Sequence, residues 1–132
     1  MAKREIITNK IKKPGGHFSQ ATVIEAEGRL VFISGMTAHR PDGSIAGIGD
    51  IEAQTRQVCE NLKNAVEAAG GTMDSICRVD VYIKDMANFD VIHKVRREYF
   101  KAPLPASTMV QISNFTSPDY LIEINAIAVI PY

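Results

Sequence analysis

The sequence predicts an α+β domain in which two helices pack on one face of a mixed β-sheet. Three observations lead to this prediction: segments whose apolar residues alternate, two longer segments whose apolar residues recur at helical spacing, and turn residues between them. In chain order these segments follow the pattern β-β-β-α-β-α-β-β, with about six strands. Covering one sheet face with two helices is the economical way to pack such elements.

Short segments rich in β-branched and alternating apolar residues predict the strands. They lie at residues 4–8, 22–26, 30–34, 76–84, 108–113 and 121–130. Between the second and third segments, Glu27-Gly28 predicts a tight hairpin turn. The fourth segment alternates most regularly, with Val79, Val81 and Ile83 on one face and polar or charged residues on the other.

Two segments predict helices, and both have recognisable ends. Asp50 caps the first, because its side chain can accept a hydrogen bond from the backbone of the first helical turn. Apolar residues then recur at helical spacing until Gly70-Gly71 ends the pattern. The second helix is expected over about residues 88–100, and Pro103 prevents it from continuing further.

Composition excludes several classes of protein. All 132 residues are expected to form one domain, because no repeat, low-complexity tract or linker divides them. At a formal net charge of +0, no long-range field draws the chain to nucleic acid or to a membrane, and no apolar run has membrane-spanning length. Two distant cysteines and a polar start indicate the cytoplasm. Metal-ligand spacing is absent, so neither a metal nor a cofactor is expected.

The residue pattern of the last strand predicts an oligomer, because the helices of one subunit cannot cover both faces of the sheet. The face that should meet the helices carries Ile122, Ile124, Ala126, Ala128 and Ile130. The opposite face carries Leu121, Glu123, Asn125, Ile127 and Val129, and the preceding strand is expected to add Ser107, Met109 and Gln111 to it. An apolar sheet face in water is more often an association surface than a tolerated patch, so we expect a closed symmetric oligomer. The alternative is that loops cover this face.

Several short motifs occur in order along nearly the whole chain. They are Ile33-Ser34-Gly35, Ala53-Gln54-Thr55-Arg56-Gln57, Asn61-Leu62, Ala68-Ala69-Gly70-Gly71, and the segments 79–85 and 122–129. In this combination the chain resembles the RidA (YjgF/YER057c/UK114) family, also described as endoribonuclease L-PSP. The resemblance implies a chorismate-mutase-like α+β sandwich and a homotrimer that binds a small molecule in clefts between its subunits.

The resemblance also implies an activity and roles for particular residues. Archetypal members hydrolyse reactive enamines and imines, such as 2-aminoacrylate, to 2-keto acids and ammonia. Glu123 matches a glutamate that helps to hold the attacking water, and it is therefore the candidate catalytic residue. Phe18 stands where a tyrosine typically lines the cleft, and Ser34-Gly35 match the family without change. Asn125 lies beside Glu123 on the same predicted face and completes this group of candidate substrate-binding residues.

Three further candidate binding positions depart from the family pattern. Deaminating members carry an arginine that clamps the substrate carboxylate, but the matching residue here is Ser107, which implies an arginine-lacking branch. Met109 replaces a typical cysteine, and His93 replaces an asparagine. His93 is equally compatible with a cleft-lining and a structural role. Arg96 and Arg97 on the same helix are expected to lie on its solvated face.

These arguments predict a deaminase that hydrolyses an imine or enamine of a small metabolite other than 2-aminoacrylate. One alternative is a trimer that binds a small ligand, or acts as a regulator, without turnover. Another is a 2-aminomuconate-type deaminase, because the long loop at residues 36–50 somewhat resembles the loop of those enzymes. Ribonuclease activity ranks last, because basic residues are interleaved with acidic ones and form no phosphate-binding cluster.

Overall fold

Strands and helices follow the predicted order in the computed structural model, which describes residues 3–25 and 27–132. The elements are β1 (Lys3–Ile6), β2 (Ala21–Ile24), β3 (Arg29–Met36), α1 (Ile51–Ala68), η1 (Met73–Ser75), β4 (Ile76–Ile83), η2 (Met86–Asn88), α2 (Phe89–Tyr99), β5 (Ala106–Gln111) and β6 (Ile122–Ile130). Every predicted helix and strand is present, with bounds that differ by a few residues. The predicted end of the second strand, Ala26, lies outside the described residues.

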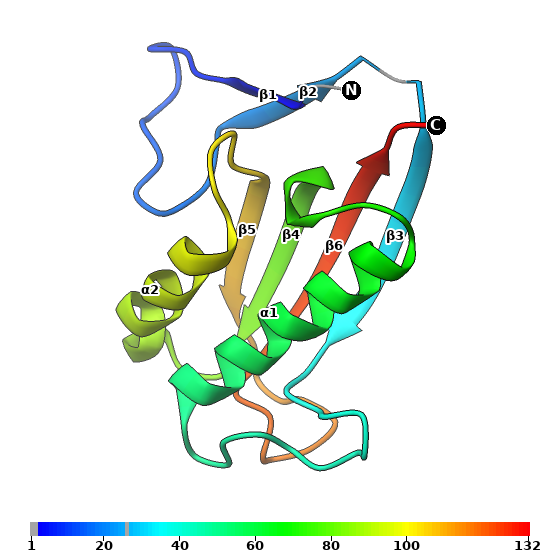
Figure 1. The fold of residues 1–132 in the computed structure, drawn as a ribbon. Helices are drawn as coiled ribbons and strands as arrows, with labels where there is room; N and C mark the ends of the chain where they lie inside the picture. Colours follow the sequence, from blue (N-terminus) through cyan, green and yellow to red (C-terminus); the bar gives the residue numbers. More distant parts are fainter. Residues whose placement is uncertain (1–2, 26) are drawn as a thin grey trace.

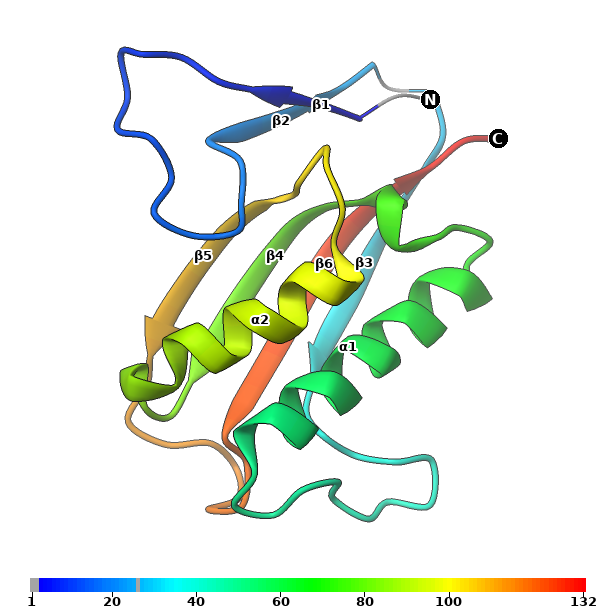
Figure 2. The same cartoon turned by 60° about the vertical axis from the view of Figure 1, so that its left-hand side comes forward.

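Four strands form the main sheet, in the order β3-β6-β4-β5. β5 runs parallel to β4, whereas β6 runs antiparallel to both of its neighbours, so the sheet is mixed as predicted. Helices α1 and α2 lie side by side across one face of this sheet, and no helix formed by residues 3–25 or 27–132 covers the opposite face (Figure 1, Figure 2). The predicted α+β sandwich, with two helices on one face, is confirmed.

The predicted hairpin between β2 and β3 is wrong. β2 pairs with β1 in a separate two-stranded ribbon, whereas β3 pairs with β6 in the main sheet. The ribbon lies across one end of β4, where Lys3 Nζ donates to the carbonyl of Ile76 over 2.8 Å and Thr22 Oγ1 donates to the carbonyl of Cys77 over 3.0 Å (Figure 1). A turn signal shows that the chain changes direction, but the partners of each strand depend on contacts with distant residues.

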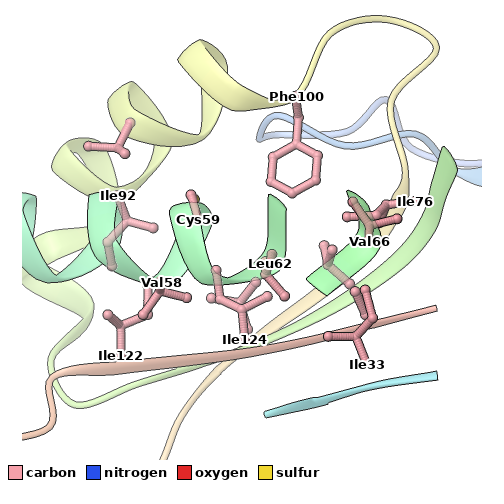
Figure 3. Packing of buried hydrophobic residues seen from close by; sticks show 14 of the residues in the cluster. Ile33, Val58, Cys59, Leu62, Val66, Ile76, Ile92, Phe100, Ile122 and Ile124 are labelled. Atoms are coloured by element: carbon pink, nitrogen blue, oxygen red, sulfur yellow. The ribbon is translucent and has the colours of Figure 1, made fainter. Parts of the chain in front are cut away.

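The hydrophobic core fills the space between the helices and the sheet (Figure 3). Helix α1 contributes Val58, Cys59, Leu62 and Val66, and helix α2 contributes Ile92 and Val95, all without solvent exposure. From below, β6 contributes alternate residues, Ile122, Ile124, Ala126, Ala128 and Ile130. The predicted inward face of the last strand is therefore confirmed. The intervening residues of β6 point to the opposite face of the sheet, called the open face because neither helix covers it.

The first helix begins and ends where the sequence predicts. Asp50 Oδ1 accepts a hydrogen bond from the backbone N–H of Ala53 over 3.0 Å, which satisfies one of the free donors of the first turn. Past Ala68, Gly70 has a φ of 98°, a left-handed conformation that glycine adopts without a steric penalty. Local sequence therefore determines the length of α1.

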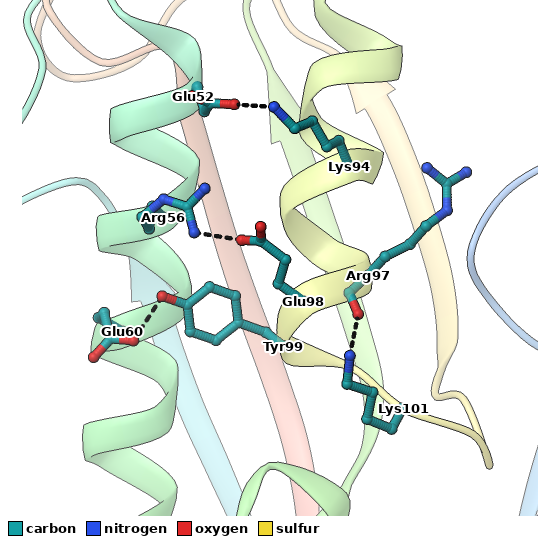
Figure 4. Close-up of polar contacts among 8 residues, drawn as sticks. All are labelled: Glu52, Arg56, Glu60, Lys94, Arg97, Glu98, Tyr99 and Lys101. Carbon is teal, nitrogen blue, oxygen red and sulfur yellow. Dashed lines mark hydrogen bonds and ion pairs between the residues drawn. The ribbon is translucent and has the colours of Figure 1, made fainter.

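Polar side chains join the two helices along their outer surface (Figure 4). The pairs are Glu52 with Lys94, Arg56 with Glu98, and Glu60 with Tyr99. The first two are solvent-exposed ion pairs, which contribute little to stability because water screens them and ordering long side chains costs entropy. The buried apolar contacts therefore hold the helices on the sheet.

Candidate functional site

The carboxylate of Glu123 lies directly against Gly35, on the open face of the sheet. A Cβ added at Gly35 would lie 2.5 Å from Glu123 Oε2, closer than two such atoms can approach. Strand β6 directs Glu123 to this face because its neighbours in the strand point into the core. In β3, the register shifts between Ile33 and Met36, and this irregularity includes Gly35. Only a residue without a side chain leaves room for the carboxylate at this point.

A surface hollow of about 580 Å³ adjoins Glu123. Its lining consists of Tyr82, Ile112, Asn114, Phe115, Thr116 and Glu123. Tyr82 is the β4 residue paired with Glu123, and the remaining residues come from the loop between β5 and β6. The hollow combines one carboxylate with two aromatic rings and an amide, so it can hold a small organic molecule with its reactive atom close to Glu123.

The part of the open face that β3 and β6 form is mainly apolar, as the sequence predicts. Leu30 and Phe32 on β3 are 63% and 73% exposed, and Ile127 and Val129 lie beside them on β6. Ser34 is exposed on β3 and Asn125 is half-buried on β6, both close to Glu123 in the strand order. A surface of this composition is typical of a face that another protein chain covers.

The prediction that Ser107, Met109 and Gln111 share this face is wrong. These residues pair with Val79, Val81 and Ile83 of β4, which point into the core under the helices. Directly paired residues of neighbouring strands point to the same side of a sheet. Ser107 and Met109 therefore lie on the helix side, where Met109 packs against the core, and they are separated from Glu123 by the sheet.

A second group of candidate residues gathers where α2 crosses the edge strand β5. Ser107 of β5 contacts α2 directly, because its Oγ accepts a hydrogen bond from Arg96 Nη2 over 3.0 Å. The loop before β2 covers the same region, and a Cβ added at Gly16 would lie 2.7 Å from His93 Nε2 and 3.2 Å from the ring of Phe18. One candidate set, Phe18, His93, Ser107 and Met109, thus lies near α2 and β5. The other, Ser34, Gly35, Glu123 and Asn125, lies on the open face.

His93 is a buried, neutral acceptor rather than a charged group. Its ring is 3% exposed and stacks on Phe89 with ring centroids 4.0 Å apart. Nδ1 lies 2.9 Å from the carbonyl oxygen of Phe89, and a carbonyl can only accept, so Nδ1 carries the proton and Nε2 presents a lone pair toward Gly16. Burial lowers the pKa of His93, and the nearby charge of Arg96 lowers it further.

This burial predicts an acid-sensitive stability. Because the pKa of His93 is lowered in the folded protein, the unfolded chain binds a proton near the ordinary value of 6.5 while the folded protein does not. Stability is therefore full above that pH and is lost as the pH falls below it. Urea unfolding at a series of pH values should show that His93→Gln, which remains neutral, is less destabilised by acid than the wild type. Parallel slopes for the two proteins would show that another group causes the acid sensitivity.

Arg96 is not on the solvated face of α2, contrary to expectation. Its side chain is 1% exposed, whereas the neighbouring Arg97 is exposed and points away from α1 (Figure 4). Arg96 follows Ile92 and His93 by four and three residues, so it belongs to the buried stripe of the helix. This spacing was visible in the sequence, but an arginine at a stripe position is usually assigned to solvent.

Thiol and metal chemistry have little support among residues 3–25 and 27–132. Burial raises the pKa of Cys59 to about 12, so this thiol stays protonated and is a poor nucleophile. Burial also raises the pKa of the half-buried Cys77. In the same residues, no three His, Cys, Asp or Glu side chains gather closely enough to bind a metal ion, and no helix has the length and apolar composition of a membrane span.

Comparison with known proteins identifies the family of this chain. The family model described as Endoribonuclease L-PSP matches residues 8–130. The chain belongs to the RidA/YjgF family. A RutC family protein from Pyrococcus horikoshii is 43% identical over 126 residues, which cover 96% of this chain and 97% of that protein. A second RutC family protein, from Pyrococcus abyssi, is 38% identical over 128 residues, with 97% and 98% coverage.

Solved structures of the Rid family share the fold. YyfB from Yersinia pestis, a member of the conserved Rid protein family, superposes with a TM-score of 0.89 at 30% identity, over 98% of this chain and all (100%) of that one. RidA from Psychrobacter sp. PAMC 21119 superposes with a TM-score of 0.73 at 30% identity, over 96% and 99% of the two chains. The chorismate-mutase-like fold implied by the sequence motifs is therefore shown.

Proposed function

We propose that this protein hydrolyses an imine or enamine of a small metabolite other than 2-aminoacrylate and releases ammonia. The observation that supports this most strongly is the Glu123 carboxylate, held against Gly35 at the rim of a hollow of about 580 Å³. A carboxylate in this setting can hold a water molecule beside a bound ligand. Membership of the RidA/YjgF family supports the same reaction class.

The reaction needs little machinery, because an imine carbon is already electrophilic. A water held by Glu123 attacks that carbon, a C–O bond forms, and the electron pair of the C=N bond moves to nitrogen. Glu123 accepts the proton that the water loses and returns it to the nitrogen. The carbinolamine then collapses: Glu123 transfers the hydroxyl proton to the amine nitrogen, the oxygen electron pair forms the C=O bond as the C–N bond breaks, ammonia leaves, and a carbonyl compound remains. Positioning the water against the carbon supplies most of the acceleration.

The two groups of candidate residues support a site between subunits. Glu123 lies on the open face of the sheet, whereas Ser107 and His93 lie on the helix side, so one chain cannot present them to the same ligand. A closed homotrimer would cover the apolar face around Phe32 and Leu30, and it would place the open face of one subunit against the β5 edge of the next. Each cleft would then contain one group from each subunit.

Ser107 is the reason for expecting a substrate other than 2-aminoacrylate. The family resemblance implies an arginine at this position in deaminating members, and a serine hydroxyl cannot provide the charge-matched, bidentate contact that holds so small an acid. The same residue favours the alternative function, a trimer that binds a small ligand without turnover. The two functions share a site and differ only in whether the imine is hydrolysed.

The decisive test is an imine-hydrolysis assay. An amino-acid oxidase generates a panel of imines in situ, and release of ammonia and keto acid is followed with and without the protein. We expect acceleration for at least one imine that is larger than 2-aminoacrylate, and weak activity on 2-aminoacrylate itself. Efficient protection of an enzyme that 2-aminoacrylate inactivates would contradict the substrate assignment. Binding of a panel member without acceleration would favour the alternative function.

Sedimentation tests the assembly on which the site depends. A homotrimer is expected, since the apolar face and the divided candidate residues both require a neighbouring chain. A stable monomer at micromolar concentration would contradict the proposed cleft, and with it the role of Glu123 in such a cleft.

A further inference from the structure

Arg96 carries a buried charge that no acidic residue in the described part of the chain neutralises. Its side chain is 1% exposed, and its guanidinium makes a single described hydrogen bond, from Nη2 to Ser107 Oγ. The Nε donor is buried without a partner. The ion pairs among residues 3–25 and 27–132 join Arg56 to Glu98, Arg78 to Asp80 and Lys94 to Glu52, and none of them includes Arg96.

A guanidinium in this position remains charged and is costly to bury. Burial lowers the pKa of Arg96 to about 10, which is still well above neutral pH. Removing an ion from water is strongly unfavourable unless an opposite charge and complete hydrogen bonding offset the loss, and an apolar side chain of similar size avoids the penalty. Arg96 lies on the buried stripe of α2 beside Ile92 and Val95, where methionine or leucine would pack without this cost. A buried, unpaired cation of this kind indicates a binding site for an anion.

The polar side chains next to Arg96, Ser107 and His93, are uncharged. Ser107, which accepts from the guanidinium, is half-buried near the start of β5, the edge strand of the sheet, whereas Arg96 is almost completely buried. On the same buried stripe of α2, His93 is neutral and presents the lone pair of Nε2 toward Gly16, close to the ring of Phe18. No carboxylate among the described residues bonds to any of these groups.

We propose that Arg96 and Ser107 together bind the carboxylate of the ligand. Arg96 supplies the charge, and the hydroxyl of Ser107 accepts from Arg96 while donating its own proton to the ligand carboxylate. A hydroxyl can accept and donate at the same time, and such a chain strengthens both hydrogen bonds. The cation therefore comes from helix α2, rather than from the β5 position at which the family resemblance implies an arginine. Ser107 lies between Arg96 and the ligand carboxylate in this proposed arrangement.

This site narrows the substrate class, and in this respect it rests on the proposed function. The ligand is an imine that carries a carboxylate, and that carboxylate lies at the junction of α2 and β5 in one subunit. Its imine carbon must reach Glu123 of the next subunit, on the open face of the sheet. Because the charge is recessed behind Ser107, the ligand extends further than 2-aminoacrylate does.

The test compares the binding of an acid with the binding of its uncharged analogue. The probes are 2-oxohexanoate and its primary amide, and calorimetry measures the affinity of each for the intact wild-type protein. We expect the acid to bind about tenfold more tightly or better, because the Ser107 hydroxyl, polarised by Arg96, donates to a charged rather than a neutral acceptor. Arg97→Gln, which removes an exposed charge from the same helix, should keep this preference. Arg96→Met should bind the acid and the amide about equally, and Arg96→Lys should keep part of the preference.

Stability separates this binding role from a structural one. Unliganded Arg96→Met should unfold at the same temperature as the wild type or a higher one, because it replaces an unpaired buried charge with an apolar side chain. The acid should raise the unfolding temperature of the wild type and of Arg97→Gln, but not that of Arg96→Met. A structural arginine would show the reverse pattern, with a large loss of stability in Arg96→Met and no effect of the acid on the wild type.

The possible outcomes distinguish this site from the proposed function. Equal affinity of the wild type for acid and amide would overturn the site, even if imine hydrolysis is found. A preference that persists in Arg96→Met would also overturn it. Absence of hydrolysis, with the acid preference present and lost in Arg96→Met, would remove the enzymatic proposal and keep the anion site. If Arg96→Met does not fold, Ser107→Ala provides the same comparison, because it should lower the affinity for the acid more than the affinity for the amide.

Discussion

Glu123→Gln is expected to lower the rate of imine hydrolysis by about 10²- to 10⁴-fold, the range typical of a lost general base. The substitution keeps the shape of the side chain and most of its hydrogen bonds, but an amide cannot accept a proton from the attacking water. The effect should fall on kcat more than on KM, because Glu123 acts on the water rather than on the ligand carboxylate. Steady-state kinetics on the best imine of the panel measures it.

A matched control shows that the loss is specific. Glu67→Gln makes the same chemical change at an exposed position of α1, away from the open face of the sheet, and it should leave the rate unchanged. Sedimentation of Glu123→Gln should show the same assembly as the wild type. If Glu123→Gln dissociates while its remaining trimers keep full activity, Glu123 stabilises the interface and the proposed mechanism is wrong.

Gly35→Ala should abolish most of the activity without unfolding the protein. The added methyl group would lie 2.5 Å from Glu123 Oε2, so the carboxylate must move. The carboxylate is the free end of a flexible side chain, and its displacement costs little stability. A shift of about 1 Å in a catalytic group can reduce a rate by about 10²-fold, so the loss should approach that of Glu123→Gln. Kinetics and thermal unfolding of the same preparation measure both quantities.

Gly15→Ala is the appropriate control, because a methyl group added there meets no other atom within 4 Å. It makes the same change in backbone entropy in the unfolded chain and should leave the rate unchanged. Full activity in Gly35→Ala would show that the reaction does not depend on where the Glu123 carboxylate lies, which contradicts the assignment of Glu123 as the base.

The position of each helix and strand followed from the sequence, and so did the two faces of the last strand. Asp50 and Gly70 set the ends of α1 through contacts within a few residues. The alternation around Glu123 placed that carboxylate on the face opposite the helices. These features depend on the periods of helix and strand and on local capping, which the order of residues specifies directly. The motifs identified the family for the same reason, since they too are local.

Three features depended on the tertiary structure. The partner of β2 is β1 rather than β3, although Glu27-Gly28 lies between β2 and β3. Ser107 lies on the helix side because β5 pairs with β4 in a register that the sequence does not specify, and an offset of one residue reverses the face of every side chain in a strand. Helical spacing places Arg96 on the buried stripe of α2, but its contact with Ser107 and its missing ion-pair partner depend on how α2 packs against β5, which local sequence does not determine. The separation of Glu123 from Ser107, and the unpaired charge behind Ser107, could therefore be recognised only in the folded chain.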